Sequence, residues 1–298
     1  MNSQGFIENE NKILYYIISK ISSGATCLCM LGRSPSNETL YSIKIYENKE
    51  VYEKDKYFSL SLQGHPSFLS LLDFGMACYS FTNYNKVKVN RHQIYYEVFE
   101  YCENGDLYNF LNRDDKLLPV SFIKKLSMQI ISGIKYMHNK NIAHFDIKPQ
   151  NILIDNNYNA KIIDFGSSQQ FKDKKENYKG VFLGTKLFCS REYKYTENKG
   201  VNLFKFDIFS LGVTLFCLFT KKNPFLNYSI IIKENGTCQE NGYSYIIKRR
   251  KDKFWESYNY VPESSKDLIF RMLTDKENER ISLDEVINHS FFKQEIYP

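Results

Sequence analysis

The sequence predicts an α+β protein with a strand-rich first part and a larger, mainly helical second part, and three patterns indicate this fold class. The first hundred residues alternate short apolar runs with turn signals, as the strands of an antiparallel sheet do. One helical stretch, about 50–62, interrupts these runs and ends at Gly64-His65-Pro66. Helical periodicity dominates later in the chain, so we expect two lobes with a short joint near 100–105.

The individual elements follow from local patterns. Strands are expected at 13–19, 40–46, 68–74 and 94–101, where apolar runs are bounded by turn residues. A long helix is expected at 117–139, because apolar residues recur there at helical spacing, namely Phe122, Leu126, Ile130, Ile134 and Met137. The longest apolar stretch, 208–219, is too short to span a membrane and predicts a core helix.

Size and composition disfavour several classes of protein. With 298 residues and 43% apolar residues, the chain is long enough for two packed cores and has a normal globular composition. The net charge of +6 is mild, and the basic run 248–251 is broken by Asp252, so we expect a solvated helix face rather than a nucleic-acid or membrane site. Seven dispersed cysteines and the lack of a signal-peptide pattern predict an intracellular, cytoplasmic protein with reduced thiols.

Two short motifs together supply the parts that phosphoryl transfer needs. His144-Phe145-Asp146-Ile147-Lys148-Pro149-Gln150-Asn151 is followed, eighteen positions after Asp146, by Asp164-Phe165-Gly166. Phosphoryl transfer requires positioning, charge neutralisation and a carboxylate that accepts the hydroxyl proton. Asp146 can accept that proton, and Lys148 can place a cation beside the transferred phosphate. Asn151 and Asp164 offer the hard oxygen ligands that Mg²⁺ prefers.

These motifs resemble the catalytic loop and the Mg-binding motif of the eukaryotic protein kinase superfamily. The resemblance extends from about Ile13 to Phe292 and implies a bilobal kinase domain over 1–298. Its implied parts are an N-lobe at 13–101, a hinge at 102–105 and a C-lobe at 106–292. It also implies ATP and Mg²⁺ as cofactors and a protein as the substrate, and we expect a monomer.

The serine/threonine type of kinase is implied by two positions. Lys148 follows Asp146 by two residues, and Thr185 follows Gly184, whereas tyrosine kinases carry an arginine-containing variant of the catalytic loop. The resemblance therefore implies transfer of the γ-phosphoryl group of ATP to serine or threonine hydroxyls.

Lys44 occupies the position of the family's strand-borne lysine, which binds the α- and β-phosphates of ATP and pairs with an acid on the next helix. Counting back from His65-Pro66 places Asp55 at that acid's position. Glu53 is the alternative, but its register would turn Lys56 inward. An aspartate is one methylene shorter than the family's glutamate, so either the helix approaches more closely or the ion pair is weaker.

Position in the family's layout implies further site residues. The implied ATP contacts are Ile21, Gly24, Cys29, Ser42, Lys44, Glu100, Cys102, Asp106 and Leu153. The implied structural supports are Asp55, Glu192, Asp207 and Arg280. Among these, Glu192 is expected to pair with Arg280, and Asp207 to brace the catalytic loop from below.

Two departures from the family's pattern bear on activity. The glycine loop at 21–29 keeps one glycine of three, and Phe145 replaces the arginine that normally receives a phosphorylated activation segment. We hypothesise that activation needs no phosphorylation of 167–195; the alternative is that Phe145 simply packs and Lys174 or Lys175 takes over. We predict an active kinase, and the alternative is an inactive kinase-like scaffold that binds nucleotide or partners.

Overall fold

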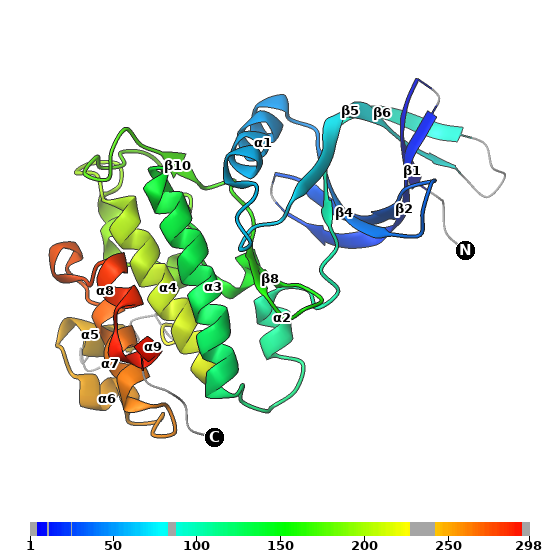
Figure 1. Ribbon diagram of the computed structural model, residues 1–298. Coiled ribbons are helices and arrows are strands. Elements are labelled where there is room, and N and C mark those ends of the chain that lie inside the picture. Colours follow the sequence, from blue (N-terminus) through cyan, green and yellow to red (C-terminus); the bar gives the residue numbers. More distant parts are fainter. Residues whose placement is uncertain (1–4, 11, 25, 83–87, 227–241, 294–298) are drawn as a thin grey trace, which may run out of the picture. The chain divides into compact units, whose positions relative to one another are not determined.

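The computed structural model describes residues 5–10, 12–24, 26–82, 88–226 and 242–293. The chain divides into two compact units, and the first contains Met1–Glu103 together with Ile163–Gly166. The second contains Asn104–Ile162 and Ser167–Pro298. The first unit is built from strands with one long helix and the second mainly from helices, which confirms the predicted fold class (Figure 1).

The strands of the first unit close into an antiparallel barrel in the order β1-β2-β3-β4-β6-β5. Their bounds are β1 (Gly5–Asn9), β2 (Lys12–Ser23), β3 (Leu28–Arg33), β4 (Leu40–Tyr46), β5 (Leu71–Thr82) and β6 (Lys88–Glu100). Ile7, Ile43 and Val98 lie in its apolar core and have no exposed surface. The sequence predicted a sheet that begins at residue 13, whereas β1 pairs with both β2 and β5 and closes the barrel. Its five residues are too few for a recognisable alternation.

Helix α1 (Lys49–Leu62) belongs to the first unit and lies beside the barrel (Figure 1). It begins after Asn48, whose side chain accepts a hydrogen bond from the backbone N–H of Val51, as N-cap residues do. Gly64, with a φ of +91°, follows the end of the helix in the left-handed region that glycine favours. Its buried face consists of Tyr52, Asp55, Phe58, Ser59 and Leu62. A buried carboxylate on this mainly apolar and aromatic face requires a partner.

The second unit is organised around two long helices, α3 (Val120–Asn139) and α4 (Leu203–Thr220), which lie side by side (Figure 1). Its other helices are α2 (Leu107–Leu111), α5 (Gly242–Ile247), α6 (Lys251–Trp255), α7 (Glu263–Met272), α8 (Leu283–Ile287) and α9 (Ser290–Lys293). Its short strands are β7 (Ile142–Ala143), β8 (Ile152–Ile154), β9 (Ala160–Ile162) and β10 (Gln169–Gln170), which pair as β7–β10 and β8–β9. By length and composition α4 is apolar enough to cross a membrane, but 94% of it is buried inside the structure, as in the core helix of a folded domain.

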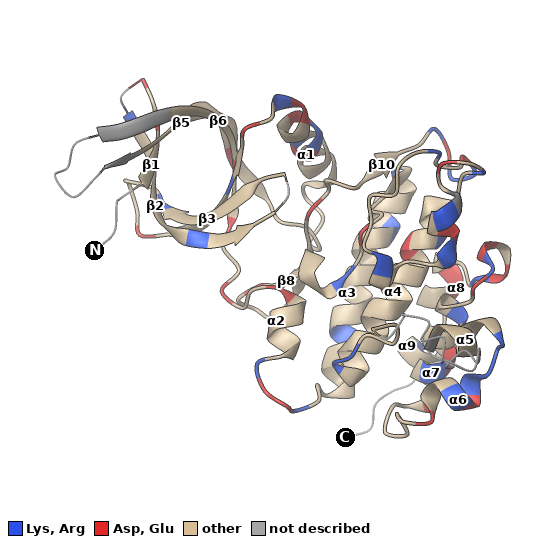
Figure 2. Cartoon of the chain, turned by 180° about the vertical axis from the view of Figure 1, so that it is seen from behind, with Lys and Arg blue, Asp and Glu red and all other residues tan. Residues whose placement is uncertain are grey.

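The basic run 248–251 lies mostly in the turn between α5 and α6, and not on a helix face as predicted. Arg249 adopts a φ of +52°, which ends the preceding helix. Arg249 forms an ion pair with Glu279, and Lys251 Nζ lies 2.9 Å from Glu263 Oε1. Figure 2 shows basic and acidic residues interleaved over this part of the second unit. Acidic neighbours therefore offset the charge of the run.

One acid lies on the fully buried surface of α4. Asp207 has no exposed surface, and its Oδ1 accepts a hydrogen bond of 2.8 Å from the backbone N–H of Phe145. Its Oδ2 accepts one of 2.9 Å from the backbone N–H of His144 and lies 2.9 Å from His138 Nε2. The core helix thus fixes the backbone that follows β7.

We expect Asp207→Ala to lower the free energy of unfolding by about 3–5 kcal/mol, because two buried amides would lose their acceptor. Urea unfolding followed by circular dichroism measures this loss. Asp284→Ala is the control, since that carboxylate is 79% exposed, pairs with Lys135 at 3.2 Å and should leave stability close to that of the wild type. Equal midpoints for the two variants would contradict the bracing role of Asp207.

Candidate active site

The loop between β7 and β8 brings three of the predicted residues together. Asp146 is 9% exposed, and its Oδ2 lies 2.6 Å from Lys148 Nζ and 3.0 Å from Asn151 Nδ2. Asn151 Nδ2 also donates to the backbone carbonyl of Asp146 at 2.8 Å. Among the described residues, Asp146 Oδ1 has no hydrogen-bond partner although it is buried. The loop therefore holds one carboxylate oxygen in place and leaves the other able to accept a proton.

Asn151 and Asp164, the two residues expected to bind magnesium, each have an oxygen atom whose surroundings the structure describes. Both amide hydrogens of Asn151 are directed to Asp146, so its carbonyl oxygen is the atom left to face a cation. Asp164 belongs to the first unit, has a φ of +67°, and its Oδ1 accepts from the backbone N–H of Gly166 at 3.3 Å. No cluster of three or more His, Cys, Asp or Glu forms a metal cage among the described residues. Each of these side chains, taken by itself, offers an oxygen of the kind that Mg²⁺ prefers, and their implied role as metal ligands stays a prediction.

In the first unit, Lys44 pairs with Asp55. The distance from Lys44 Nζ to Asp55 Oδ2 is 2.6 Å, and both side chains are largely buried. Burial alone would lower the pKa of Lys44, but the charges of Asp55 and Asp164 outweigh it and raise the pKa above its usual value. Glu53, the alternative partner, pairs instead with Lys56 one turn away on α1. The shorter aspartate therefore reaches the lysine with full hydrogen-bond geometry.

The residues implied to contact ATP from the first unit lie on neighbouring strands. Cys29 Sγ lies 3.2 Å from Ser42 Oγ, and Cys29 is opposite Lys44 in the β3–β4 ladder. The N–H of Gly24 donates to the Cys27 carbonyl at 3.0 Å. A Cβ added at Gly24 would meet only that carbonyl at 3.5 Å, an ordinary contact. The neighbours of Gly24 would therefore accept a side chain at this position, and its implied contact with ATP stays a prediction.

The remaining residues implied to contact ATP are divided between the two units. Ile21 is 44% exposed on β2, Glu100 ends β6, and Cys102 is buried after it. In the second unit, Leu153 lies on β8 and forms a bridge with Asp106. The two carboxylate oxygens of Asp106 accept from the backbone and the side chain of Asn109, so this residue caps α2. Its implied contact with ATP stays a prediction.

Phe145 is 1% exposed and lies at the centre of an aromatic cluster. Its ring makes edge-to-face contacts with Tyr178 at 5.3 Å, Phe182 at 5.6 Å and Phe206 at 5.1 Å between centroids. Tyr178 and Phe182 belong to the segment expected to control activation, and Phe206 belongs to α4. The side chain before Asp146 therefore attaches this segment to the core through apolar contacts.

Gly184 and Thr185 connect the same segment to the catalytic loop. A Cβ at Gly184 would lie 2.6 Å from the backbone oxygen of Phe145, so only glycine permits this approach. The next residue, Thr185, places its Oγ1 2.9 Å from Lys148 Nζ. Lys148 thus contacts both the Asp146 carboxylate and the segment.

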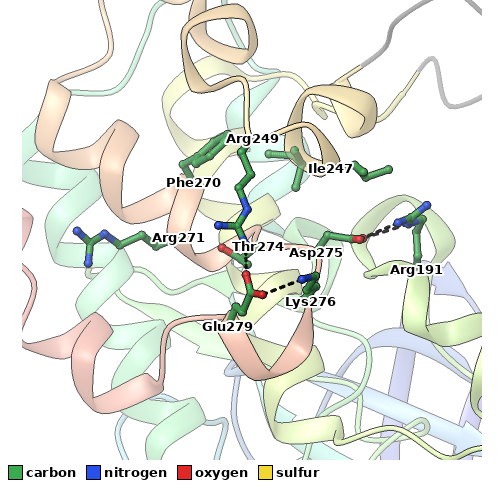
Figure 3. Close-up of a pocket in the computed structure, with 10 residues that line it drawn as sticks. Arg191, Ile247, Arg249, Phe270, Arg271, Thr274, Asp275, Lys276 and Glu279 are labelled. Carbon is green, nitrogen blue, oxygen red and sulfur yellow. Dashed lines mark hydrogen bonds and ion pairs between the residues drawn. The ribbon is translucent and has the colours of Figure 1, made fainter.

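Two ion pairs anchor the end of the segment in the second unit. Arg280 Nη2 lies 2.7 Å from Glu192 Oε1, and the arginine side chain is fully buried. Arg191 forms two hydrogen bonds to Asp275, at 3.1 and 2.7 Å (Figure 3). This second pair lines a hollow of about 450 Å³ together with residues of α5 and α7. The sequence predicted the Glu192–Arg280 pair but not the Arg191–Asp275 pair. The sequence signal for the second pair was a charged side chain directly before Glu192.

Comparison with known proteins identifies the family of this chain. The family described as "Protein kinase domain" matches residues 15–292. Death-associated protein kinase 2 of Mus musculus is 27% identical over 305 aligned positions, which cover 97% of this chain and 74% of that protein. Carbon catabolite-derepressing protein kinase of Secale cereale is 32% identical over 202 positions, which cover 67% of this chain and 36% of that protein.

A third relative, CBL-interacting serine/threonine-protein kinase 7 of Arabidopsis thaliana, is 25% identical over 95% of this chain and 61% of that protein. The chain thus spans between 36% and 74% of the length of these three relatives. Since the family match covers nearly all of the sequence, the chain belongs to the protein kinase family.

Proposed function

We propose that this chain is a catalytically active serine/threonine kinase that transfers the γ-phosphoryl group of Mg-ATP to hydroxyls of a protein substrate. The observation that carries the proposal is the arrangement around Asp146, whose carboxylate is held by Lys148 and Asn151 within 3.0 Å. Positioned groups of this kind provide most of what phosphoryl transfer requires.

Each residue has a separate role in the proposed reaction. Asp146 orients the substrate hydroxyl and accepts its proton, for which its unpartnered Oδ1 is suited. Lys148 holds Asp146 in place and supplies positive charge beside the group being transferred. Lys44, fixed by Asp55, would bind the α- and β-phosphates of the nucleotide. Asn151 and Asp164 would hold Mg²⁺, which when bound neutralises charge on the phosphate oxygens.

We further infer that the activation segment needs no phosphate to hold its position. A phosphorylated segment requires a cation that receives the phosphate, and Phe145 instead buries its ring against Tyr178 and Phe182. Phosphorylation of Thr185 would place a dianion on the lysine that holds Asp146, because Thr185 Oγ1 already contacts Lys148 Nζ. Lys174, one of the alternative receivers, directs its Nζ to Asn139 Oδ1 at 3.2 Å.

We expect Lys44→Ala and Asp146→Ala each to lower phosphate incorporation into a generic protein substrate such as casein by at least about 100-fold. The measurement is transfer of label from γ-labelled ATP in the presence of Mg²⁺. Lys125→Ala is a matched control, since that exposed lysine donates to the backbone carbonyl of Asn157 and has no place in the proposed reaction, so it should leave the rate unchanged. A wild-type protein that binds Mg-ATP but incorporates no label would favour the kinase-like scaffold instead.

We expect protein treated with a phosphatase to keep its full rate of label incorporation, because apolar packing around Phe145 holds the segment. Mass spectrometry of the treated sample confirms that residues 167–195 carry no phosphate before the rate is measured. Loss of activity on dephosphorylation, restored by phosphorylation at Thr185 or Tyr178, would overturn this inference.

A further inference from the structure

A second buried carboxylate lies beside the Lys44–Asp55 pair, and the proposed function does not use it. Glu97 lies on β6, opposite Lys44 of β4, and has no exposed surface. Its Oε2 lies 2.6 Å from the hydroxyl oxygen of Tyr46, and the same hydroxyl lies 2.5 Å from Oδ2 of Asp55. Tyr46 is itself 1% exposed. Two carboxylates therefore share one tyrosine hydroxyl in a site closed to water.

The two contacts of the Tyr46 hydroxyl require two hydrogens, one more than the hydroxyl itself carries. A tyrosine hydroxyl donates a single hydrogen, whereas an ionised carboxylate only accepts. Both contacts have hydrogen-bond lengths, so if Tyr46 donates to one acid, the other acid must donate to the tyrosine oxygen. Burial, followed by the charge of Asp55, raises the pKa of Tyr46 far above its usual value, so the tyrosine keeps its own proton. One of the two acids is therefore neutral.

Charge and hydrogen bonding identify Glu97 as the neutral acid. Oδ2 of Asp55 accepts a hydrogen bond from Lys44 Nζ, and this cation stabilises the ionised form of Asp55. Glu97 forms no ion pair with any residue that the structure describes, and its Oε1 is buried there without a hydrogen-bond partner. An unpartnered oxygen costs less on a neutral carboxyl group than on a carboxylate. With Glu97 protonated, the buried group of Lys44, Asp55 and Glu97 has no net charge.

We propose that protonated Glu97 and Tyr46 are positioning residues for the reaction, with Glu97 donating to Tyr46 and Tyr46 donating to Asp55. This chain of hydrogen bonds fixes the short aspartate on Lys44 and so fixes the lysine for its nucleotide. Ionisation of Glu97 would remove one donor, add a second negative charge next to Asp55 and draw Lys44 away from its place. The inference rests on the proposed function and adds a dependence of that function on pH.

The groups that face Glu97 agree with this assignment. They are Asp55, Tyr52 and Lys56 from α1, and Lys44 and Tyr46 from β4. Burial first, and then the charge of Asp55, raise the pKa of Glu97 to about 7, although Lys44, the Tyr46 hydrogen bond and Lys56 act in the opposite direction. The folded chain thus binds this proton more tightly than the unfolded chain does. Its contribution to stability is present below the usual pKa of glutamate and is lost as the pH rises through about 7.

The protonation state can be measured directly, without any assay of activity. Carbon-13 NMR of protein labelled at the glutamate carboxyl carbon gives the titration midpoint of each glutamate, and Glu97→Gln identifies the resonance of Glu97. We expect a midpoint more than one pH unit above that of the exposed glutamates. A midpoint near the usual value of glutamate would overturn the proposal, whether or not the protein transfers phosphate.

The kinetic test compares pH profiles of kcat/KM for ATP between pH 6 and pH 8. A single ionisation near pH 7 leaves about one molecule in ten protonated at pH 8, so we expect the wild-type value to fall about tenfold. Glu97→Gln keeps a neutral donor toward Tyr46 and should retain the rate measured at pH 6 across the range. A fall in Glu97→Gln as steep as that of the wild type would overturn the proposal.

Two further variants distinguish the positioning role of Glu97 and Tyr46 from the effect of changing any buried polar group of the barrel. Glu8→Gln is the matched control, because Glu8 is also a buried barrel glutamate with a hydroxyl partner, Ser80 Oγ at 2.8 Å, and should keep the wild-type profile. Tyr46→Phe keeps the ring and removes the shared hydroxyl, so it should lower kcat/KM several-fold even at pH 6. A Tyr46→Phe rate equal to that of the wild type at every pH would contradict the hydrogen-bond chain.

Discussion

The carboxylate of Asp207 accepts hydrogen bonds from two consecutive backbone amides, and the position of the proposed catalytic groups depends on this contact. Those amides belong to His144 and Phe145, directly before Asp146. Because α4 is buried along nearly its whole length, its acid is held by the core of the second unit and moves with it. The backbone directly before the proposed proton acceptor is thereby attached to a buried helix. This is the structural basis for treating Asp146 as a positioned group.

The same contact explains a strained backbone. Phe145 has a φ of +67°, a conformation that costs a non-glycine residue about 1–3 kcal/mol and persists only where the surroundings enforce it. Here its N–H is bound by Asp207, its carbonyl is covered by Gly184, and its ring is enclosed by aromatic neighbours. The strain directs the Phe145 ring toward the activation segment and the next side chain, Asp146, toward Lys148. Strain at this residue therefore links the segment to the proposed proton acceptor.

The sequence allowed the fold class and the family to be predicted because their evidence is local. The spacing between Asp146 and Asp164 and the helical period of 117–139 need no knowledge of tertiary contacts. Closure of the barrel by β1 could not be predicted, because five residues carry too little alternation and their pairing with β5 spans a long stretch of chain. The Arg191–Asp275 pair was missed for the same reason, since 84 positions separate its members. Sequence motifs therefore indicate which functional side chains are present, whereas contacts between residues far apart in the chain show how these side chains are positioned.

Glu97 illustrates what a motif comparison leaves out. Within strand β6 it is one polar residue in a mostly apolar run. Its proposed role depends on Tyr46 and Asp55, which lie 51 and 42 positions away in the sequence. The replacement of an arginine by Phe145 removes a charge that would respond to phosphate, and the buried glutamate supplies a charge that responds to protons. Together the two inferences predict an activity that follows the surrounding pH rather than the phosphorylation of residues 167–195.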